Sequence, residues 1–210
     1  MVKAVYSPSG QGTLDFMAAE VLNEAYMVIP QPTVNTEIIT VDDEDTEVIP
    51  SPSFEHNHGH DVESLFWIAL FILFFYRDVS SPEEDEAQEK ERRSCSAFVF
   101  PGNILQSKSN RYRVIFVQTV FKDHVQWFCR SFKQLVVPLS KLVNAFNYAY
   151  TSFERTMGKN KDPGIFSIVH RYAIAVFESC EKKAENITIQ SYKGRQTEGV
   201  LQSPELSATP

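Results

Sequence analysis

The sequence has few cysteines, and their spacing does not suggest that they act together. Cys95, Cys129 and Cys180 lie far apart, their number is odd, and no C-x-x-C motif occurs. This argues against a disulfide framework and against a cysteine zinc site, and it is typical of a reducing compartment. The first ten residues also lack the apolar stretch of a secretory signal. We therefore expect an intracellular protein, and nothing in the sequence distinguishes the cytoplasm from the nucleus.

The sequence is also short of positive charge. Its formal net charge is −7, and acidic residues gather in two blocks, at 42–47 and 83–91. Phosphate binding requires a basic surface, so nucleic acid is not expected as a partner, and we interpret the blocks as solvated loops. Because 43% of the residues are hydrophobic and 12% are aromatic, the chain can bury a real core. Its length is typical of one domain with tails.

Several motifs of common enzyme classes are missing. The sequence has no G-x-S-x-G nucleophile elbow, no G-x-G-x-x-G fingerprint and no G-x-x-x-x-G-K-[ST] phosphate loop. Runs of valine and isoleucine suited to strands are scarce. The sequence therefore predicts an all-α protein with long loops.

The most prominent feature that is present is an apolar run from Leu65 to Tyr76. Such a run forms either a buried helix or a membrane span, and twelve residues cover only about 18 Å against about 30 Å of hydrocarbon. We therefore expect a core helix and no membrane, with other segments packed around its whole circumference. Asp61 is expected to cap the helix at the N–H of Ser64, and Glu63 to lie in its first turn.

Further helices are expected on both sides of this run. Residues 12–22 predict a short helix ending near Asn23, and residues 111–157 predict two helices that are separated by a break at Pro138. A last helix is expected to start at Asp162-Pro163 and to end near Ala184. Its predicted buried face consists of Ile165, Ile168, Val169, Tyr172, Val176 and Phe177. Residues 30–59 are predicted to be a loop insertion, and residues 186–210 a flexible tail. Residues 78–94 are predicted to be a charged linker, with a short exposed helix as the alternative for its Glu/Lys/Arg-rich part.

The histidines offer one weak metal-binding pattern. His56, His58 and His60 alternate along the chain, and three histidines in an extended loop can bind a transition metal. No outer partner of these rings can be named from the sequence, so we favour a polar turn that leads into the core helix. His124 and His170 lie within amphipathic helical patterns and are interpreted as helix residues.

Two stretches together resemble a known family. G-T-L-D-F-M-A-A-E-V-L at 12–22 is followed by H-D-V-E-S-L-F-W at 60–67, which opens the apolar run. This resembles the large lobe of a eukaryotic protein kinase, and it is most similar to the fungal-type protein kinase family. The resemblance is specific over 12–22 and 56–76, and loose over 111–184. It implies a partial protein-kinase-like domain at 12–184, which is a C-lobe fragment with insertions at about 30–59 and 78–100. A flexible N-terminus (1–11) would precede this domain, and a flexible tail (185–210) would follow it.

The resemblance also implies roles for four residues. Thr13 matches a threonine that bonds the catalytic loop, and Phe16 an aromatic residue that shapes the substrate-peptide groove. Glu20 matches a glutamate in a buried ion pair with an arginine, and Asp61 an aspartate that holds the catalytic-loop backbone. Ala19 stands where the family usually has proline.

The arginine partner of Glu20 is not fixed by any motif. Arg171 and Arg155 are the two candidates, because the family places this arginine near the last helices.

The catalytic part of the kinase pattern is absent. Family members use ATP and magnesium, and this requires a Gly-rich loop, a strand lysine, a catalytic aspartate with its asparagine, and a metal-binding aspartate. No H-R-D-x-x-x-x-N or D-F-G motif occurs, and only eleven residues precede Gly12. We expect no catalytic residue, no cofactor and no metal in this chain, and hence a kinase-like fragment that is inactive alone. The alternatives are a non-catalytic protein-interaction module with a protein partner, or an unrelated α-helical protein.

Overall fold

A computed structural model describes residues 16–23, 54, 56–102, 104–155 and 164–192. Helices dominate this part of the chain, as the sequence predicts, and two short strands form the exception. The elements in chain order are α1 (Ala19–Asn23), α2 (His58–Phe75), β1 (Tyr76–Asp78), α3 (Glu86–Val99), α4 (Ile104–Phe116), α5 (Gln118–Val125), the 3₁₀ helix η3 (Arg130–Phe132), α6 (Lys133–Arg155), α7 (Gly164–Ala184) and β2 (Ile189–Ser191).

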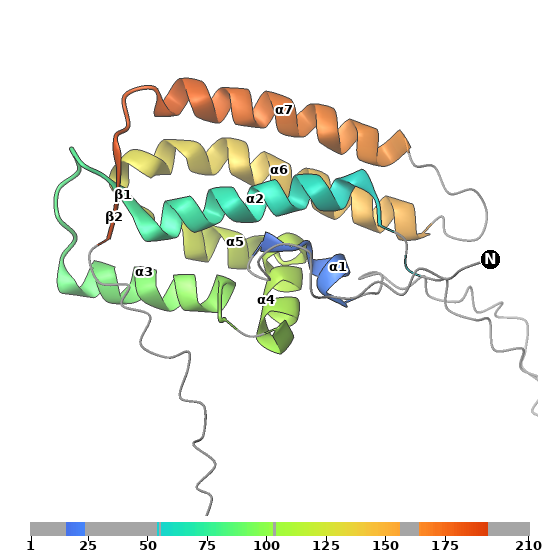
Figure 1. Cartoon of the computed structure of the whole chain (residues 1–210), viewed down its shortest axis with the longest axis horizontal. Coiled ribbons are helices and arrows are strands. Elements are labelled where there is room, and N and C mark those ends of the chain that lie inside the picture. The colour runs from blue at the N-terminus through green and yellow to red at the C-terminus, as the bar shows by residue number, and fades with distance from the viewer. Residues whose placement is uncertain (1–15, 24–53, 55, 103, 156–163, 193–210) are drawn as a thin grey trace, which may run out of the picture.

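Three long helices form the main body of the fold. α2, α6 and α7 lie side by side with their axes roughly aligned, and α4 runs across them (Figure 1). The short α1 is wedged between α2 and α4, although it comes first in the chain. α2 therefore lies at the centre, with neighbours from both halves of the sequence.

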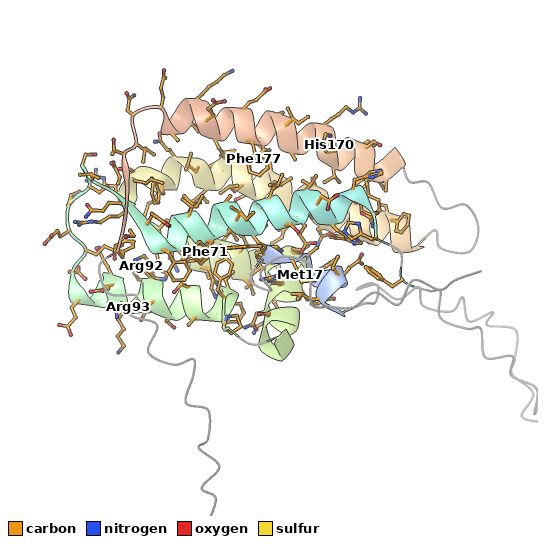
Figure 2. All side chains as sticks on the ribbon, in the orientation of Figure 1. Met17, Phe71, Arg92, Arg93, His170 and Phe177 are labelled. Atoms are coloured by element: carbon orange, nitrogen blue, oxygen red, sulfur yellow. The ribbon has the colours of Figure 1, made fainter. Side chains whose placement is uncertain are left out.

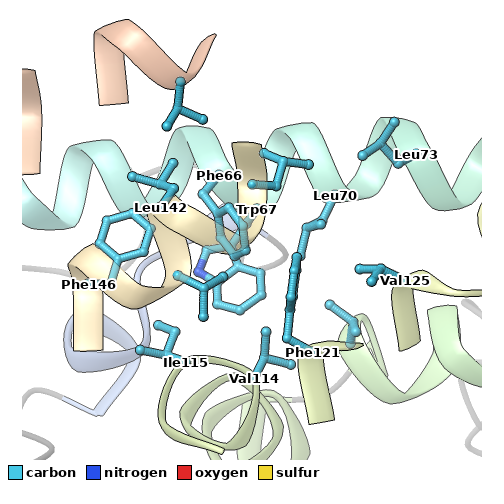
Figure 3. Packing of buried hydrophobic residues seen from close by; sticks show 14 of the residues in the cluster. Phe66, Trp67, Leu70, Leu73, Val114, Ile115, Phe121, Val125, Leu142 and Phe146 are labelled. Atoms are coloured by element: carbon cyan, nitrogen blue, oxygen red, sulfur yellow. The ribbon is translucent and has the colours of Figure 1, made fainter. Parts of the chain in front are cut away.

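Large aromatic side chains fill the core around α2. Phe66 and Trp67 are completely buried, and the Phe66 ring lies 5.7 Å from the ring of Phe146 and 6.1 Å from that of Phe121 (Figure 3). Side chains from α4, α5 and α6 thus converge on one side of α2. The prediction that Trp67 belongs to the core is confirmed.

The expectation that α2 is buried all round is wrong. The side of α2 away from the core leaves Leu65 53% exposed and Ile68 38% exposed. Because every side of this run is apolar in sequence, its pattern could not show which side would remain uncovered. By length and composition α2 could also cross a membrane, but half of its residues are buried inside the bundle, as in the core helix of a soluble protein.

The predicted linker and part of the predicted tail belong to the fold. In the predicted linker 78–94, Asp85 caps α3, whose Arg92 is buried and donates from Nη1 to the Phe74 carbonyl at 2.8 Å. In the predicted tail, β2 pairs antiparallel with β1, so that Gln190 lies opposite Arg77. Residues 193–210 lie outside the described part, as do residues 1–11 and 30–53.

The structure differs from the predictions at two further places. Pro138 lies inside α6 and does not break the helix. On α7, Ile168 and Tyr172 are exposed, although the pattern placed them on the buried face. The predicted end of α7 at Ala184 is confirmed, and so is the short helix that ends at Asn23.

A glycine allows α7 to approach α2 closely. A β-carbon on Gly59 would lie 2.4 Å from Cδ1 of Phe166 and 2.8 Å from Oδ1 of Asn57. The Phe166 ring also contacts Tyr150 and Phe153 of α6, with ring centroids 5.9 and 4.9 Å apart. Phe166 therefore has little freedom to move away from a larger residue at position 59.

We predict that Gly59→Ala lowers the free energy of unfolding by about 1–3 kcal/mol, the usual cost of overpacking. At an uncrowded helical position the same change would raise it by up to about 1 kcal/mol. Denaturant unfolding measures the difference, and in a Phe166→Leu background the cost should shrink. A gain of stability from Gly59→Ala alone would contradict the close contact.

Candidate functional site

A buried carboxylate joins three segments at the start of α2. Glu63 is completely buried. Its Oε1 accepts hydrogen bonds from the Ala19 backbone N–H and from Nε1–H of Trp67, each at 2.8 Å, and its Oε2 accepts one from the Tyr150 hydroxyl. The carboxylate therefore links α1, α2 and α6. Burial raises the pKa of Glu63 above its ordinary value, and the three donors only partly offset this.

His60, one turn before Glu63, is also buried and bridges two segments. Its Nδ1 accepts the Asn57 backbone N–H at 3.0 Å, so the proton lies on Nε2, which donates to Glu20 Oε2 at 2.8 Å. Asn57 in turn accepts the Gly59 N–H at 2.8 Å and is the N-cap of α2. His60 thus completes a capping box and holds the glutamate of α1.

A third buried group reaches the same short helix from α4. Arg111 is completely buried, donates from Nη1 to the Met17 carbonyl, and has its guanidinium carbon 5.0 Å from the centre of the Trp67 ring. Just before α1, Phe16 packs edge-on against Phe71 of α2, with ring centroids 5.2 Å apart. We call the side chains of His60, Glu63, Phe71 and Arg111, which contact residues 16–20, the α1 seat.

The structure brings together two of the four residues that the resemblance singled out. Phe16 and Glu20 both lie at the α1 seat, and Oε2 of Glu20 lies 2.8 Å from Nε2 of His60. Asp61 is exposed, with its carboxylate 3.7 Å from the His56 ring, so its predicted capping role is wrong: α2 begins three residues earlier and Asn57 is the cap. Thr13 lies outside the described residues.

Neither arginine candidate for Glu20 is established by the structure. Arg171 is exposed on α7 and therefore does not supply a buried ion pair. The side chain of Arg155 lies outside the described part of the chain. The family usually has proline at position 19, but here Ala19 gives Glu63 a backbone N–H that proline does not have.

The three alternating histidines do not act as a group. His60 is buried with both ring nitrogens engaged, whereas His56 and His58 are exposed. In the described ranges no three histidine, cysteine or acidic side chains are placed to hold a metal ion. His124 is a helix residue as expected, with Nδ1 2.6 Å from the Val120 carbonyl, and His170 lies on the outer surface of α7 (Figure 2).

A second polar cluster lies at the other end of α2. Asp78 accepts the Ser80 and Ser131 hydroxyls at 2.6 and 2.7 Å, and these bonds hold the pKa of its carboxyl down at about 2. An open cavity of about 460 Å³ beside it is lined by Arg130, Ser131, Gln134, Lys183, Asn186 and Ile187. A carboxylate with so low a pKa is a poor proton acceptor at neutral pH, so we interpret this cluster as a structural connection between β1 and η3.

Arg92 organises the neighbouring surface. Its guanidinium binds both carboxylate oxygens of Glu84, at 2.8 and 3.1 Å, and lies 3.4 Å over the Tyr192 ring. The Tyr192 hydroxyl donates to Glu84 at 2.5 Å, and burial raises the pKa of this hydroxyl. The arginine thus fixes the residue after β2 to the start of α3.

The thiols show no sign of activation. Burial raises the pKa of Cys95 to about 11 and also raises the pKa of Cys180, so both remain protonated at neutral pH. Cys129 is buried, with Sγ 3.0 Å from the Ser81 hydroxyl.

Sequence reasoning missed most of the α1 seat. His60 and Glu63 were considered only as a loop ligand and a first-turn charge, and Arg111 and Tyr150 were not considered at all. The spacing of Glu63 and Trp67, one helical turn apart, is a usable signal for a side-chain pair. Arg111 and Tyr150 carry no local signal, because their partners lie 94 and 87 positions away.

Comparison with protein-family models, with curated proteins and with solved structures gives no match. The geometry of the described residues is therefore the basis for any functional assignment.

We predict that Glu63→Gln gains stability relative to the unsubstituted protein as the pH rises from 4 to 7. Glutamine can accept the Ala19 and Trp67 donors with its oxygen and donate to the Tyr150 hydroxyl with its amide. A folded-state pKa above the ordinary 4.5 means that the folded protein binds more protons, so its stability falls as the pH rises through the raised value. The glutamine variant lacks this loss.

Denaturant unfolding at several pH values measures the difference between the two proteins. Glu178→Gln, on the exposed side of α7, is the matched control and should show no such trend. The account of a buried, costly carboxylate would be contradicted if the stability difference stayed constant with pH. It would also be contradicted if the unsubstituted protein gained stability relative to Glu63→Gln as the pH rises.

Proposed function

We propose that this chain is a non-catalytic, kinase-like protein-interaction module. The observation that carries the proposal is the uncovered apolar side of α2, the helix at the centre of the fold, where Leu65 is 53% and Ile68 is 38% exposed. Leu65, Ile68 and Ile72 are spaced by three and four residues and lie along one side of the helix, with Ile72 only partly covered. A surface of this form suits a partner helix with an apolar stripe.

The other polar groups of the described residues give less reason to expect catalysis. The carboxylate of Asp78 is occupied by hydroxyl donors, Glu63 and His60 hold α1, and the two partly buried thiols have raised pKa values. In the sequence, the kinase motifs for ATP and magnesium are absent. These observations favour binding over phosphoryl transfer.

A second candidate function is favoured by the docking of α1. In the kinase resemblance, the A-A-E stretch ends the activation segment and lies near the central helix, and here Ala19 and Glu20 bond directly to Glu63 and His60 at the start of α2. On this hypothesis the chain supplies the helical part of a fungal-type protein kinase. Its nucleotide-binding and catalytic residues would come from a segment outside this sequence.

The test is the native size of the tagged chain in extracts of the cells that produce it. We expect the unsubstituted chain to elute in a complex well above the 24.0 kDa of one copy, and Leu65→Glu/Ile68→Glu to elute at that mass. Both substituted side chains are exposed, so the melting temperature should change little. Val137→Glu, at a 63% exposed position on α6, is the control and should leave the complex intact.

Two outcomes would contradict the interaction module. One is that the unsubstituted chain elutes as a single copy. The other is that the double variant elutes at the same large size as the unsubstituted chain. Phosphoryl transfer from Mg-ATP to a peptide by the complex, but not by the isolated chain, would favour the second candidate.

A further inference from the structure

The first described segment is attached to the fold like a bound peptide. Residues 16–20 are anchored by hydrogen bonds to residues far away in sequence: Ala19 to Glu63, 44 positions apart; Glu20 to His60, 40 apart; and Met17 to Arg111, 94 apart. Figure 2 shows Met17 beside α4, next to α2. A helix of five residues is too short to be stable alone, so these contacts hold it in place.

The α1 seat contains buried polar groups that need bonding partners. His60, Glu63 and Arg111 are all completely buried, and each of them bonds to the segment. Burying such groups without partners costs free energy, so the seat strongly favours an occupant that supplies these bonds. Ala18 and Ala19 are also completely buried, so larger side chains are disfavoured at these two positions.

We propose that the α1 seat is a peptide-recognition site, and that residues 16–20 are its built-in occupant. The seat would accept a peptide in trans with the pattern aromatic-x-Ala-Ala-Glu, as in Phe16–Glu20. The aromatic ring packs on Phe71, the two small residues fit the closed part, and the glutamate accepts from His60. The second small residue must carry a backbone N–H for Glu63, so the site discriminates against proline there. This inference concerns a different side of α2 from the proposed docking face and does not depend on it.

The experiment uses the full chain with Glu20→Lys and a fluorescent synthetic peptide of residues 14–24. Lysine at position 20 would place a buried ammonium against the Nε2–H of His60, where the carboxylate of Glu20 now accepts, so the built-in segment should leave the seat. We expect saturable binding of the peptide to this variant by fluorescence anisotropy. Binding to the unsubstituted chain should be at least tenfold weaker, because its seat is already filled.

Two control peptides make the test specific. A peptide with Ala19→Pro lacks the donor to Glu63 although proline suits the first turn of a helix, and it should bind at least tenfold more weakly. A peptide with Glu20→Lys should not bind. Equal binding of the parent and Ala19→Pro peptides would overturn the proposal, as would absence of binding to a folded Glu20→Lys chain.

Hydrogen exchange on the unsubstituted chain provides the second measurement if the Glu20→Lys chain does not fold. If the segment can leave its seat while the rest of the chain stays folded, the amides of residues 18–22 should exchange much faster than the protected amides of α2 and α6. Equal protection of the segment and these two helices would overturn the proposal, because the segment would then leave its seat only on global unfolding.

Discussion

The buried carboxylate of Glu63 is the constraint on which the arrangement of this fold depends. It receives donors from α1, from its own helix and from α6, so one side chain fixes three segments that lie far apart in the sequence. Burying it raises the pKa of Glu63, so its charged form is costly in free energy. Such a group gives the core a defined geometry rather than extra stability, because a half-satisfied carboxylate would be worse than none. The same requirement disfavours proline at position 19, because proline would remove a donor.

The second constraint is the unequal environment of α2. Gly59 lets Phe166 of α7 approach one side of α2, and residues of α4 and α5 pack on a second side. The remaining side of α2 leaves Leu65 and Ile68 exposed to water. A helix that is apolar all round and covered only in part is the feature that best distinguishes this chain from a self-sufficient bundle. The proposed interaction module follows from that side, and the proposed peptide site follows from the seat of α1.

The sequence predicted the helical elements with strong periodicity or clear end signals, namely α2, the end of α7 and the short α1. It misplaced the details that depend on distant partners. Asp61 was expected to be the cap because it precedes the apolar run, but the helix begins at His58 with Asn57 as its cap, and His60 bonds to Glu20 from the first turn. α3 and β2 have polar sequences that resemble linkers, and their ordering depends on Arg92 contacting Phe74, Glu84 and Tyr192. Ile168 and Tyr172 fit the apolar period of α7 but lie beyond the edge of its contact surface.

The measurement that tests the account most directly is the exchange rate of the two indole N–H protons, followed by NMR in the unsubstituted protein. Trp67 donates to Glu63 inside the core, whereas Trp127 is only partly buried beside an open cavity of about 530 Å³. The account predicts that the Trp67 indole proton exchanges at least about a hundredfold more slowly than that of Trp127, because its exchange requires the core to open. Equal rates would mean that the Glu63 cluster is open to water, and the central position of α2 would then be wrong.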